Sequence, residues 1–442
     1  SRYNTNGSLD NDFGNDGVVL FDGGTDSDAA WDMLIQDDGK ILISGSVNNQ
    51  FTTVDDFAMV RFNTDGTPDN TFGTGGLVIT DIDGQWDNAY ALAIQDDGKI
   101  LLAGEAYSGT KRNMCVVRYE SNGSMDLTFG SGGIVLNSIG CVKDRTRAMT
   151  LQADGKILVA GFMVDGLDEQ AFLTRINTDG SIDNSFGNAG VATLDVGGND
   201  DRYWALSVRP DGKIIAAGYN GTASNWDYML VRYLIDGTLD NTFGSNGIAL
   251  SNFGINDMVQ DMVLQPDGKI LIAGGGFVFE LIRFMENGYP DTDFGDNGIV
   301  NTTIGTGFSF CQALAQQSDG KIVLAGHTRN PTEYDFALCR YHSEEGGYII
   351  DQNNVFNSIS IYPNPVAENN VSVKYQIVSG QEISIDLLAS DGKIAVSLVS
   401  NQSRTAGPHT EELLLPGDLP AGLYFVRIIS QKGSAVMKLE VN

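Results

Sequence analysis

The chain has 442 residues, of which 42% are hydrophobic, and its 54 glycines and 10 prolines indicate many turns. That length exceeds a single hydrophobic core, so at least two folded domains are expected. The 57 acidic residues outnumber 27 Lys and Arg residues, and the net charge of -30 excludes nucleic acid and anionic membrane surfaces as favoured partners. The sequence contains no run of 18 apolar residues, so no transmembrane segment is predicted. The start at Ser1 without a leader suggests that a signal peptide was removed or left out.

A motif containing "DGKI" returns six times along residues 36 to 326, each time between two apolar runs. Asp-Gly between such runs is a strong hairpin signal, because glycine takes a positive φ at low cost. The six copies are separated by 52 to 59 residues. Their lysines are Lys40, Lys99, Lys156, Lys213, Lys269 and Lys321.

An arginine follows each hairpin, and an aspartate stands three residues before each of six Phe-Gly pairs; the first of these pairs precedes the first hairpin, and none follows the sixth. Because both charges recur with the same period, we expect one structural Arg–Asp ion pair per repeat. The arginines are Arg61, Arg118, Arg175, Arg232, Arg283 and Arg340. The aspartates are Asp10, Asp69, Asp126, Asp183, Asp240 and Asp291.

Each repeat contains four short apolar runs, which predicts four antiparallel strands whose two faces are both buried. Six such sheets can bury both faces by radial arrangement, so the predicted fold is all-β, with a six-bladed β-propeller over residues 1–342. The last repeat lacks its fourth strand, and residues 17–21 are expected to supply it and close the ring. Arg2 and Tyr3 duplicate Arg340 and Tyr341, so a seventh blade is also possible.

The repeated pattern "DGKILVAG", followed by an arginine, an Asp-Gly turn and "FG", resembles the delta-60 repeat family. The resemblance covers residues 1 to 342. It implies a propeller-like repeat found in large secreted bacterial proteins, with no assigned activity.

Beyond the repeats, residues 343–355 form an expected polar linker, and residues 356–442 contain seven strand-like runs that predict a small Ig-like β-sandwich. The motifs "IYPNPV", "LLASDGKIA" and "LPAGLYFVRI", with a terminal "KLEVN", resemble the type A sorting domain of the type 9 secretion system. The resemblance implies secretion or cell-surface display, with the outer-membrane translocon and the shuttle and sortase components as partners. The residues implied to carry the sorting signal are Tyr362, Pro363, Asn364, Pro365, Gly392, Lys393, Gly422, Tyr424 and Lys438.

Five blades place an aspartate eight residues before the residue that opens the hairpin motif. Because the first strand of a propeller blade lines the central channel, these carboxylates are a candidate axial ring for Ca²⁺ or Mg²⁺. The alternative is that each one caps its own turn through backbone amides. The candidates are Asp28, Asp87, Asp144, Asp201 and Asp257.

No nucleophile elbow, zinc-protease motif or phosphate loop occurs, so no catalytic residue is predicted. The expected function is binding or adhesion outside the cell, with an unknown glycan or protein ligand. A metal-dependent propeller hydrolase or lactonase and a passive spacer remain alternatives. Aromatic residues outside the repeat pattern are candidates for stacking on sugars or for packing, namely Trp31, Trp86, Trp204, Trp226 and Tyr334. The cysteines lack zinc spacing and are expected in the core, with a disulfide as the alternative: Cys115, Cys141, Cys311 and Cys339.

Overall fold

The computed structural model describes most of the chain, and all statements below concern the described residues. These are residues 1–23, 28–48, 54–140, 143–165, 168–197, 200–222, 225–254, 257–304, 307–329, 333–342, 356–363, 366, 369–377, 380–389, 393–417, 419–430 and 433–441. The linker expected at 343–355 lies outside them, as do Cys141, Asn364, Pro365 and Gly392.

The repeats fold into sheets that we number blades 1 to 6, and within each the strands follow chain order. Blades 1 to 3 contain β1 (Asp28–Ile35), β2 (Ile41–Asn48), β3 (Asp55–Phe62) and β4 (Leu77–Thr80); β5 (Asp87–Ile94), β6 (Ile100–Ser108), β7 (Lys111–Tyr119) and β8 (Ile134–Asn137); and β9 (Lys143–Leu151), β10 (Ile157–Asp165), β11 (Asp168–Ile176) and β12 (Val191–Leu194). Blades 4 to 6 contain β13 (Asp200–Val208), β14 (Ile214–Thr222), β15 (Asn225–Tyr233) and β16 (Ile248–Ser251); β17 (Val259–Leu264), β18 (Ile270–Gly274), β19 (Phe279–Phe284) and β20 (Ile299–Thr302); and β21 (Ser309–Gln316), β22 (Ile322–Arg329) and β23 (Tyr334–Tyr341). The prediction of four antiparallel strands per complete repeat is confirmed.

The chain divides into two compact units, and the division falls within the fifth repeat. Unit 1 comprises Ser1–Gly276 with Leu281–Thr292, and unit 2 comprises Phe277–Glu280 with Asp293–Asn442. The domain boundary predicted at residue 342 stays a prediction. Within the described residues, no helix has the length and apolar character needed to cross a membrane.

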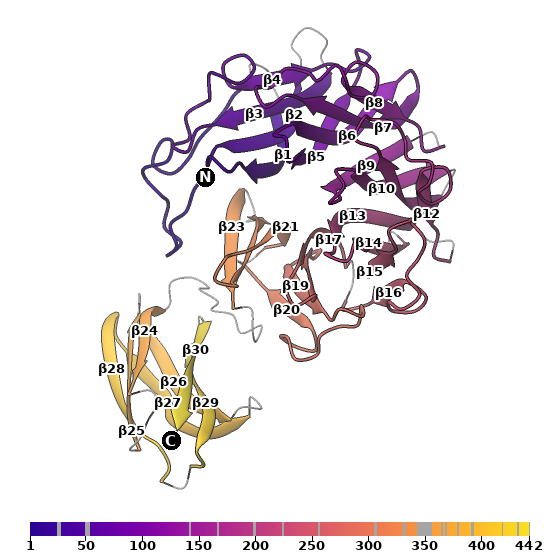
Figure 1. The fold of residues 1–442 in the computed structure, drawn as a ribbon. Coiled ribbons are helices and arrows are strands. Elements are labelled where there is room, and N and C mark those ends of the chain that lie inside the picture. The colour runs from indigo at the N-terminus through magenta and orange to yellow at the C-terminus, as the bar shows by residue number, and fades with distance from the viewer. Residues whose placement is uncertain are drawn as a thin grey trace. The chain divides into compact units, whose positions relative to one another are not determined.

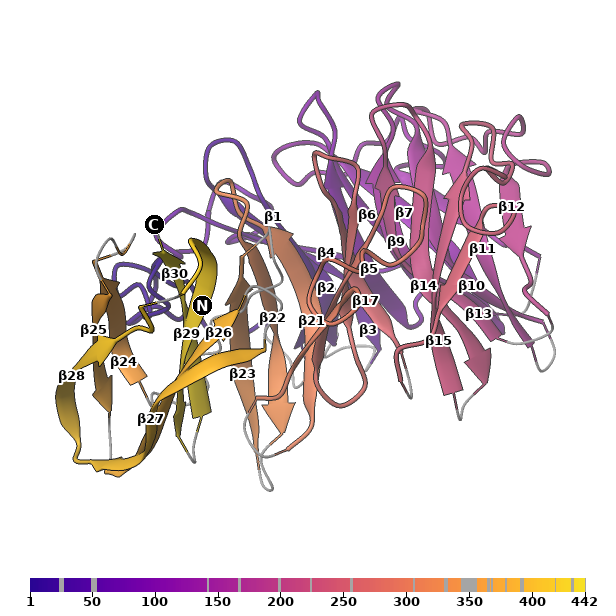
Figure 2. The ribbon, with the colours of Figure 1, turned by 90° about the horizontal axis from the view of Figure 1, so that it is seen from below.

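In unit 1, successive blades lie face to face (Figures 1 and 2), and the middle blades bury both of their faces. Consecutive residues of a strand point to opposite faces, so one strand can serve two interfaces. In β6, Leu102 packs toward blade 1 and Leu101 packs toward blade 3. The first strands of blades 1 to 5 lie beside one another in succession, and the four-residue fourth strands form the opposite edges of their blades. Because each middle blade is buried between its two neighbours, the blades of unit 1 lie next to one another in chain order.

The first 18 residues fold like the last loop of a blade and dock onto blade 1. Arg2 pairs with Asp10 at 2.8 Å, and the amide of Gly14 donates to the carbonyl of Asp65 at 2.8 Å. The same bond recurs between later blades, where Gly130 donates to Asp179. Residues 17–21 belong to no named strand, so their pairing with the last blade stays a prediction.

Two faces that are buried in the middle blades are exposed at the two ends of the repeat series. In blade 1, Met33 is 54% exposed, whereas its counterpart Leu92 in blade 2 is 4% exposed. In blade 6 of unit 2, Phe336 is 91% exposed, whereas its counterpart Met114 is fully buried. Closure of a ring would cover faces of this kind.

The C-terminal strands of unit 2 form two sheets with a shared core, as the predicted sandwich requires. One sheet has the order β24 (Phe356–Tyr362), β25 (Asn370–Ile377) and β28 (Gly407–Leu414), and the other has β27 (Ile394–Arg404), β26 (Gln381–Ala389), β29 (Gly422–Ser430) and β30 (Gly433–Val441). Val373 and Tyr375 of the first sheet join Ile385 and Val426 of the second in one buried cluster.

Candidate functional site

The two repeated motifs meet at a buried carboxylate in each complete blade. In blade 2, Asp126 Oδ2 accepts from Arg118 Nε at 2.8 Å and from Lys99 Nζ at 2.7 Å. The Arg118 guanidinium also covers the ring of Phe129, at 4.4 Å from its centroid, and donates to the carbonyl of Thr178 in blade 3 at 2.6 Å. The equivalent triads are Lys40–Arg61–Asp69, Lys156–Arg175–Asp183, Lys213–Arg232–Asp240 and Lys269–Arg283–Asp291. We call each Lys–Arg–Asp set a blade latch, because it ties the hairpin to the third strand and, in blades 1 to 4, its arginine also donates to a carbonyl of the next blade.

The first strand of every blade carries a β-bulge at the same position. A bulge leaves one residue unpaired and changes the direction in which its side chain points. In blade 3, Ala148 pairs with Ala160 and Thr146 pairs with Gly161, so that Arg147 is unpaired. The six bulge residues are Trp31, Tyr90, Arg147, Trp204, Gln260 and Gln312.

The glycine four residues after the isoleucine of each "DGKI" motif is required by this bulge. A Cβ on Gly161 would lie 1.9 Å from the carbonyl oxygen of Arg145, which is a backbone atom. The other five glycines show the same clash, at 1.7 to 2.0 Å: Gly45, Gly104, Gly218, Gly274 and Gly326. The repeated sequence therefore fixes the bulge, while the bulge residue itself varies from blade to blade.

In unit 1, the bulge residues of four blades form a continuous stack. The rings of Trp31 and Tyr90 lie 5.2 Å apart. The Arg147 guanidinium lies 4.4 Å from the centroid of Tyr90 and 5.3 Å from that of Trp204. A guanidinium within about 6 Å of a ring centroid is attracted to that ring. Arg147 therefore holds the rings on either side of it, and the four bulge residues form one row of flat groups.

Residues that follow the bulge glycines extend this row. Phe162 lies 5.0 Å from the guanidinium of Arg202, and Tyr219 lies 6.0 Å from Trp204 and 4.9 Å from Trp226. We call the whole group the arginine–aromatic cluster. It comprises Trp31, Tyr90, Glu105, Arg112, Arg147, Phe162, Glu169, Arg202, Trp204, Tyr219 and Trp226.

The charges within the cluster largely neutralise one another. Glu105 is 2% exposed and accepts from Tyr90 Oη at 3.0 Å and from Arg112 at 2.9 Å. Burial, together with the negative charge of Glu105, raises the pKa of Tyr90 to about 12, so its hydroxyl stays protonated. Burial lowers the pKa of Arg147, but Glu105 offsets part of that effect. Glu169 pairs with Arg202.

The exposed part of the cluster is an aromatic face. Trp31 is 53% exposed, whereas Phe162 and Tyr219 are 3% exposed. The stack therefore supports one indole that faces solvent. Of the other aromatics noted in the sequence, Trp204 and Trp226 lie within the cluster, while Trp86 is exposed outside it. Tyr90 and Arg147 were missed, although comparing the repeats at the third residue after the candidate ring aspartate would have found them.

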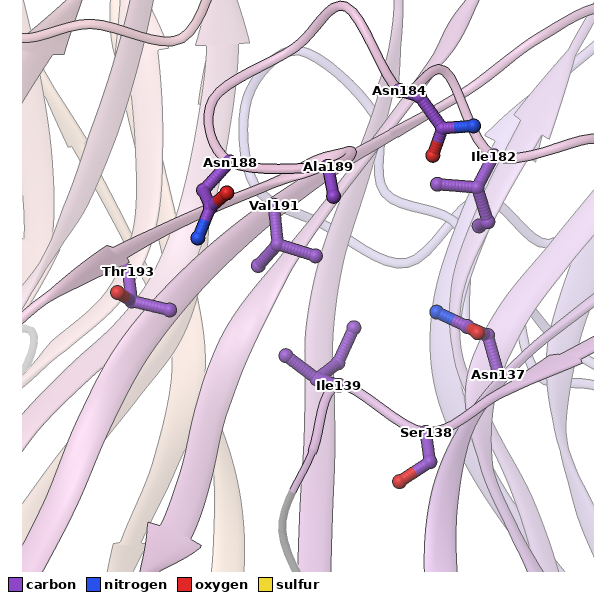
Figure 3. Close-up of a pocket in the computed structure, with 9 residues that line it drawn as sticks. All are labelled: Asn137, Ser138, Ile139, Ile182, Asn184, Asn188, Ala189, Val191 and Thr193. Atoms are coloured by element: carbon purple, nitrogen blue, oxygen red, sulfur yellow. The ribbon is translucent and has the colours of Figure 1, made fainter.

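A shallow pocket lies between the outer parts of blades 2 and 3 (Figure 3). Its volume is about 410 Å³, and Ile139 and Val191 point into it. The lining residues are Asn137, Ser138, Ile139, Ile182, Asn184, Asn188, Ala189, Val191 and Thr193. Because none of these nine side chains is titratable, the pocket offers no general acid or base.

The five candidate ring aspartates each fasten the loop that precedes their own strand. Asp87 Oδ2 accepts from the amide of Ile82 at 2.7 Å, and Asp144 Oδ2 accepts from Ile139 at 2.8 Å. The same bond joins Gly23 to Asp28, Val196 to Asp201 and Phe253 to Asp257. This geometry matches the turn-capping alternative. Within the described residues, only Asp87 belongs to a group of three acidic or metal-binding side chains close enough to share an ion, so the five-membered ring stays a prediction.

The cysteines and the sorting motifs are placed as follows. Cys115 and Cys311 are buried thiols, and Cys339 is a partly buried thiol. In the sandwich, Tyr362 ends β24 and is 44% exposed, next to Pro363, and Lys393 precedes β27. Gly422 begins β29, Tyr424 Oη donates to the carbonyl of Pro420 at 3.0 Å, and Lys438 lies opposite Phe425 in β30.

Comparison with protein families confirms both sequence resemblances. A model described as "Domain of unknown function (DUF5122) beta-propeller" matches six segments: residues 36–72, 95–129, 152–186, 209–243, 265–294 and 317–344. A model described as "Secretion system C-terminal sorting domain" matches residues 360–442. Neither description names a catalytic activity. A search of curated proteins found no match.

Solved structures similar to the chain are distant. A polysaccharide lyase of family PL25, an ulvan lyase, shares 12% identity over 77% of this chain and 88% of its own, with a TM-score of 0.42. The β-propeller domain of the trilobed protease from Pyrococcus furiosus shares 10% identity over 86% and 95%, with a TM-score of 0.38. The acylaminoacyl peptidase from Pyrococcus horikoshii shares 12% identity over 79% of this chain, with a TM-score of 0.32, and the chain spans 58% of that peptidase.

Proposed function

The chain belongs to the DUF5122 β-propeller repeat family and carries a type 9 secretion C-terminal sorting domain, and from this premise we propose that it is an exported glycan-binding protein. The sorting domain directs the protein to the cell exterior. The proposed binding site is the exposed face of the arginine–aromatic cluster. Its ligand is a sugar ring whose apolar face stacks on Trp31.

The observation that carries this proposal is the contrast between fixed and variable repeat positions. The latch residues do the same structural work in every complete blade, and the bulge glycine does so in all six blades. The bulge residues differ between blades, yet four of them join in one stack. A half-exposed indole held rigid by such a stack loses little conformational entropy on binding.

The cluster suits binding better than hydrolysis. Both of its carboxylates, Glu105 and Glu169, accept hydrogen bonds from arginines, so both are engaged in structural ion pairs. A metal-dependent hydrolase needs an open set of oxygen or nitrogen ligands next to the substrate. A passive spacer would not need a supported, exposed tryptophan.

We expect Trp31→Ala to weaken glycan binding by about tenfold, which corresponds to roughly 1.4 kcal/mol. The measurement is a titration of the full chain with the polysaccharides retained in a glycan-array screen, followed by tryptophan fluorescence. Trp86→Ala is the matched control, because Trp86 is 50% exposed but lies outside the cluster. Equal loss in both variants, or capture of a protein but of no glycan, would contradict the proposal.

Export is expected to depend on the last strand of the sandwich. β30 pairs with β29 over nine residues, so a chain that ends at residue 430 leaves the β29 edge open. In a host with the type 9 machinery, the full chain should reach the medium or the cell surface, and the shortened chain should stay in the periplasm. Fractionation followed by immunoblotting measures this, and secretion of a native cargo of the host is the control.

A further inference from the structure

Three carboxylates converge where blade 1 meets blade 2. Asp56 lies in β3, Asp81 follows β4, and Asp87 begins β5. One carboxylate oxygen of each lies within 4.8 Å of the others. Two oxygens bound to the same Ca²⁺ at about 2.4 Å are at most about 4.8 Å apart, so this spacing fits a shared ion.

A buried oxygen of Asp87 provides a second observation. Asp87 is fully buried, and its Oδ2 accepts from the Ile82 amide. Its Oδ1 is buried and forms no hydrogen bond. The amide of Tyr107 lies near Asp87 and lowers the pKa of that carboxyl to a small extent. Its hydrogen bond, however, goes to the carbonyl of Trp86 at 3.2 Å. A buried carboxylate oxygen without a partner is costly, and a bound cation removes that cost.

The other junctions of unit 1 supply an internal comparison, because they carry the same loop with different charges. Their equivalent residues are Asn113, Ser138 and Asp144; Gln170, Asp195 and Asp201; and Asp227, Asn252 and Asp257. In the last of these, Asp257 Oδ1 is also without a hydrogen bond, but Asn252 donates to Asp227 Oδ1 at 2.6 Å. An amide thus takes the place that Asp81 has in the first junction. Among the described residues, only the junction of blades 1 and 2 brings three carboxylates within 4.8 Å of one another.

Electrostatics agrees with this comparison. Burial raises the pKa of Asp87 to about 8, and the charges of Asp56 and Asp81 add to the effect. The pKa of Asp201, whose carboxyl accepts a hydrogen bond from Asn220 at 2.8 Å, is raised to about 6. No salt bridge reaches Asp81 or Asp87 from the described Lys and Arg residues.

We propose that Asp56, Asp81 and Asp87 bind one Ca²⁺ ion at the junction of blades 1 and 2. The three carboxylates supply hard oxygen ligands, and water completes the coordination on the side where Asp81 is exposed. This site takes all its ligands from one junction, unlike the axial ring, which takes one from each blade. It does not depend on the proposed glycan site.

The test is a calorimetric titration of the metal-free full chain with CaCl₂ at pH 7.5, paired with thermal unfolding. We expect one Ca²⁺ per chain, a rise in Tm on saturation, and weaker binding of MgCl₂. Asp81→Asn should weaken Ca²⁺ binding by at least tenfold, whereas Asp195→Asn, the same change at the third junction, should leave it unchanged.

Asp81 is exposed, so its replacement is not expected to prevent folding. Absence of a Ca²⁺-dependent heat and Tm rise at millimolar CaCl₂ would overturn the proposal. Equal loss of affinity in Asp81→Asn and Asp195→Asn would also overturn it, because the ion would then bind to acidic surface in general.

Discussion

Replacing Asp126 by alanine is expected to lower the free energy of unfolding by about 3 kcal/mol. The change leaves the guanidinium of Arg118, which is 8% exposed, and the ammonium of Lys99 without their shared carboxylate. Removing one partner of a fully buried ion pair costs about 3 to 5 kcal/mol, and solvent near Lys99, which is 23% exposed, screens part of this. Denaturant unfolding followed by tryptophan fluorescence measures the loss, because all four tryptophans lie in the repeats.

Asp10→Ala is the control for that measurement. Arg2 and Asp10 have the same Nε–Oδ2 distance, 2.8 Å, as Arg118 and Asp126. Their side chains are 37% and 23% exposed, and an exposed pair contributes about 0.5 kcal/mol. If both variants lost the same stability, the latch would act only as a surface ion pair.

The latch also predicts how stability depends on pH. Burial alone would raise the pKa of Asp126, but hydrogen bonds from Lys99, Thr128 and Arg118 hold it well below its usual value of 3.8. A carboxyl whose pKa is lower in the folded state stabilises the fold above the unfolded pKa and loses that contribution as the pH falls below it. Stability should therefore fall steeply below about pH 4, because Asp69, Asp183, Asp240 and Asp291 shift in the same direction.

The acid dependence is checked by repeating the denaturant titration between pH 7 and pH 3. Asp126→Ala should show a shallower loss between pH 4 and pH 3 than the unaltered chain, since one shifted carboxyl is gone. Identical slopes would mean that the shared carboxylates do not govern acid unfolding.

The repeat architecture could be predicted from the sequence because it rests on local signals. The Asp-Gly turn before Lys99 and the apolar runs on either side of it specify a hairpin without reference to the rest of the chain. The pairing of Arg118 with Asp126 followed from their common period. What the period could not show was that Lys99 joins the same carboxylate, because the lysine is 27 residues away in the chain.

The candidate site was harder to predict because it depends on backbone irregularities. Tyr90 and Arg147 occupy ordinary-looking strand positions, and only the bulge turns them toward neighbouring blades. The repetition of the candidate ring aspartates suggested both a shared ion and a local capping role. The structure shows the local contact, as for Asp144 and the loop at Ile139, while the shared ion stays a prediction.

The bulge itself can be tested through the glycine that permits it. In Gly161→Ala, the new Cβ would meet the carbonyl oxygen of Arg145 at 1.9 Å and the Cα of Thr146 at 3.0 Å. Both are backbone atoms, so no side chain can rotate away, and β9 must separate from β10 or lose its bulge. We expect a loss of about 3 kcal/mol or more in the free energy of unfolding. Gly254→Ala, whose Cβ would meet nothing closer than 3.7 Å, should cost far less.

The same variant separates the fold from the site. If β9 loses its bulge, its register shifts by one residue and Arg147 turns to the other face of the sheet. The contacts of Arg147 with Tyr90 and Trp204 would then break, and Trp31 would lose the stack that supports it. Gly161→Ala should therefore weaken glycan binding under conditions in which the chain is still folded, although residue 161 is buried and cannot touch a ligand. Unchanged binding by a folded Gly161→Ala chain would show that the row of bulge residues does not form the binding surface.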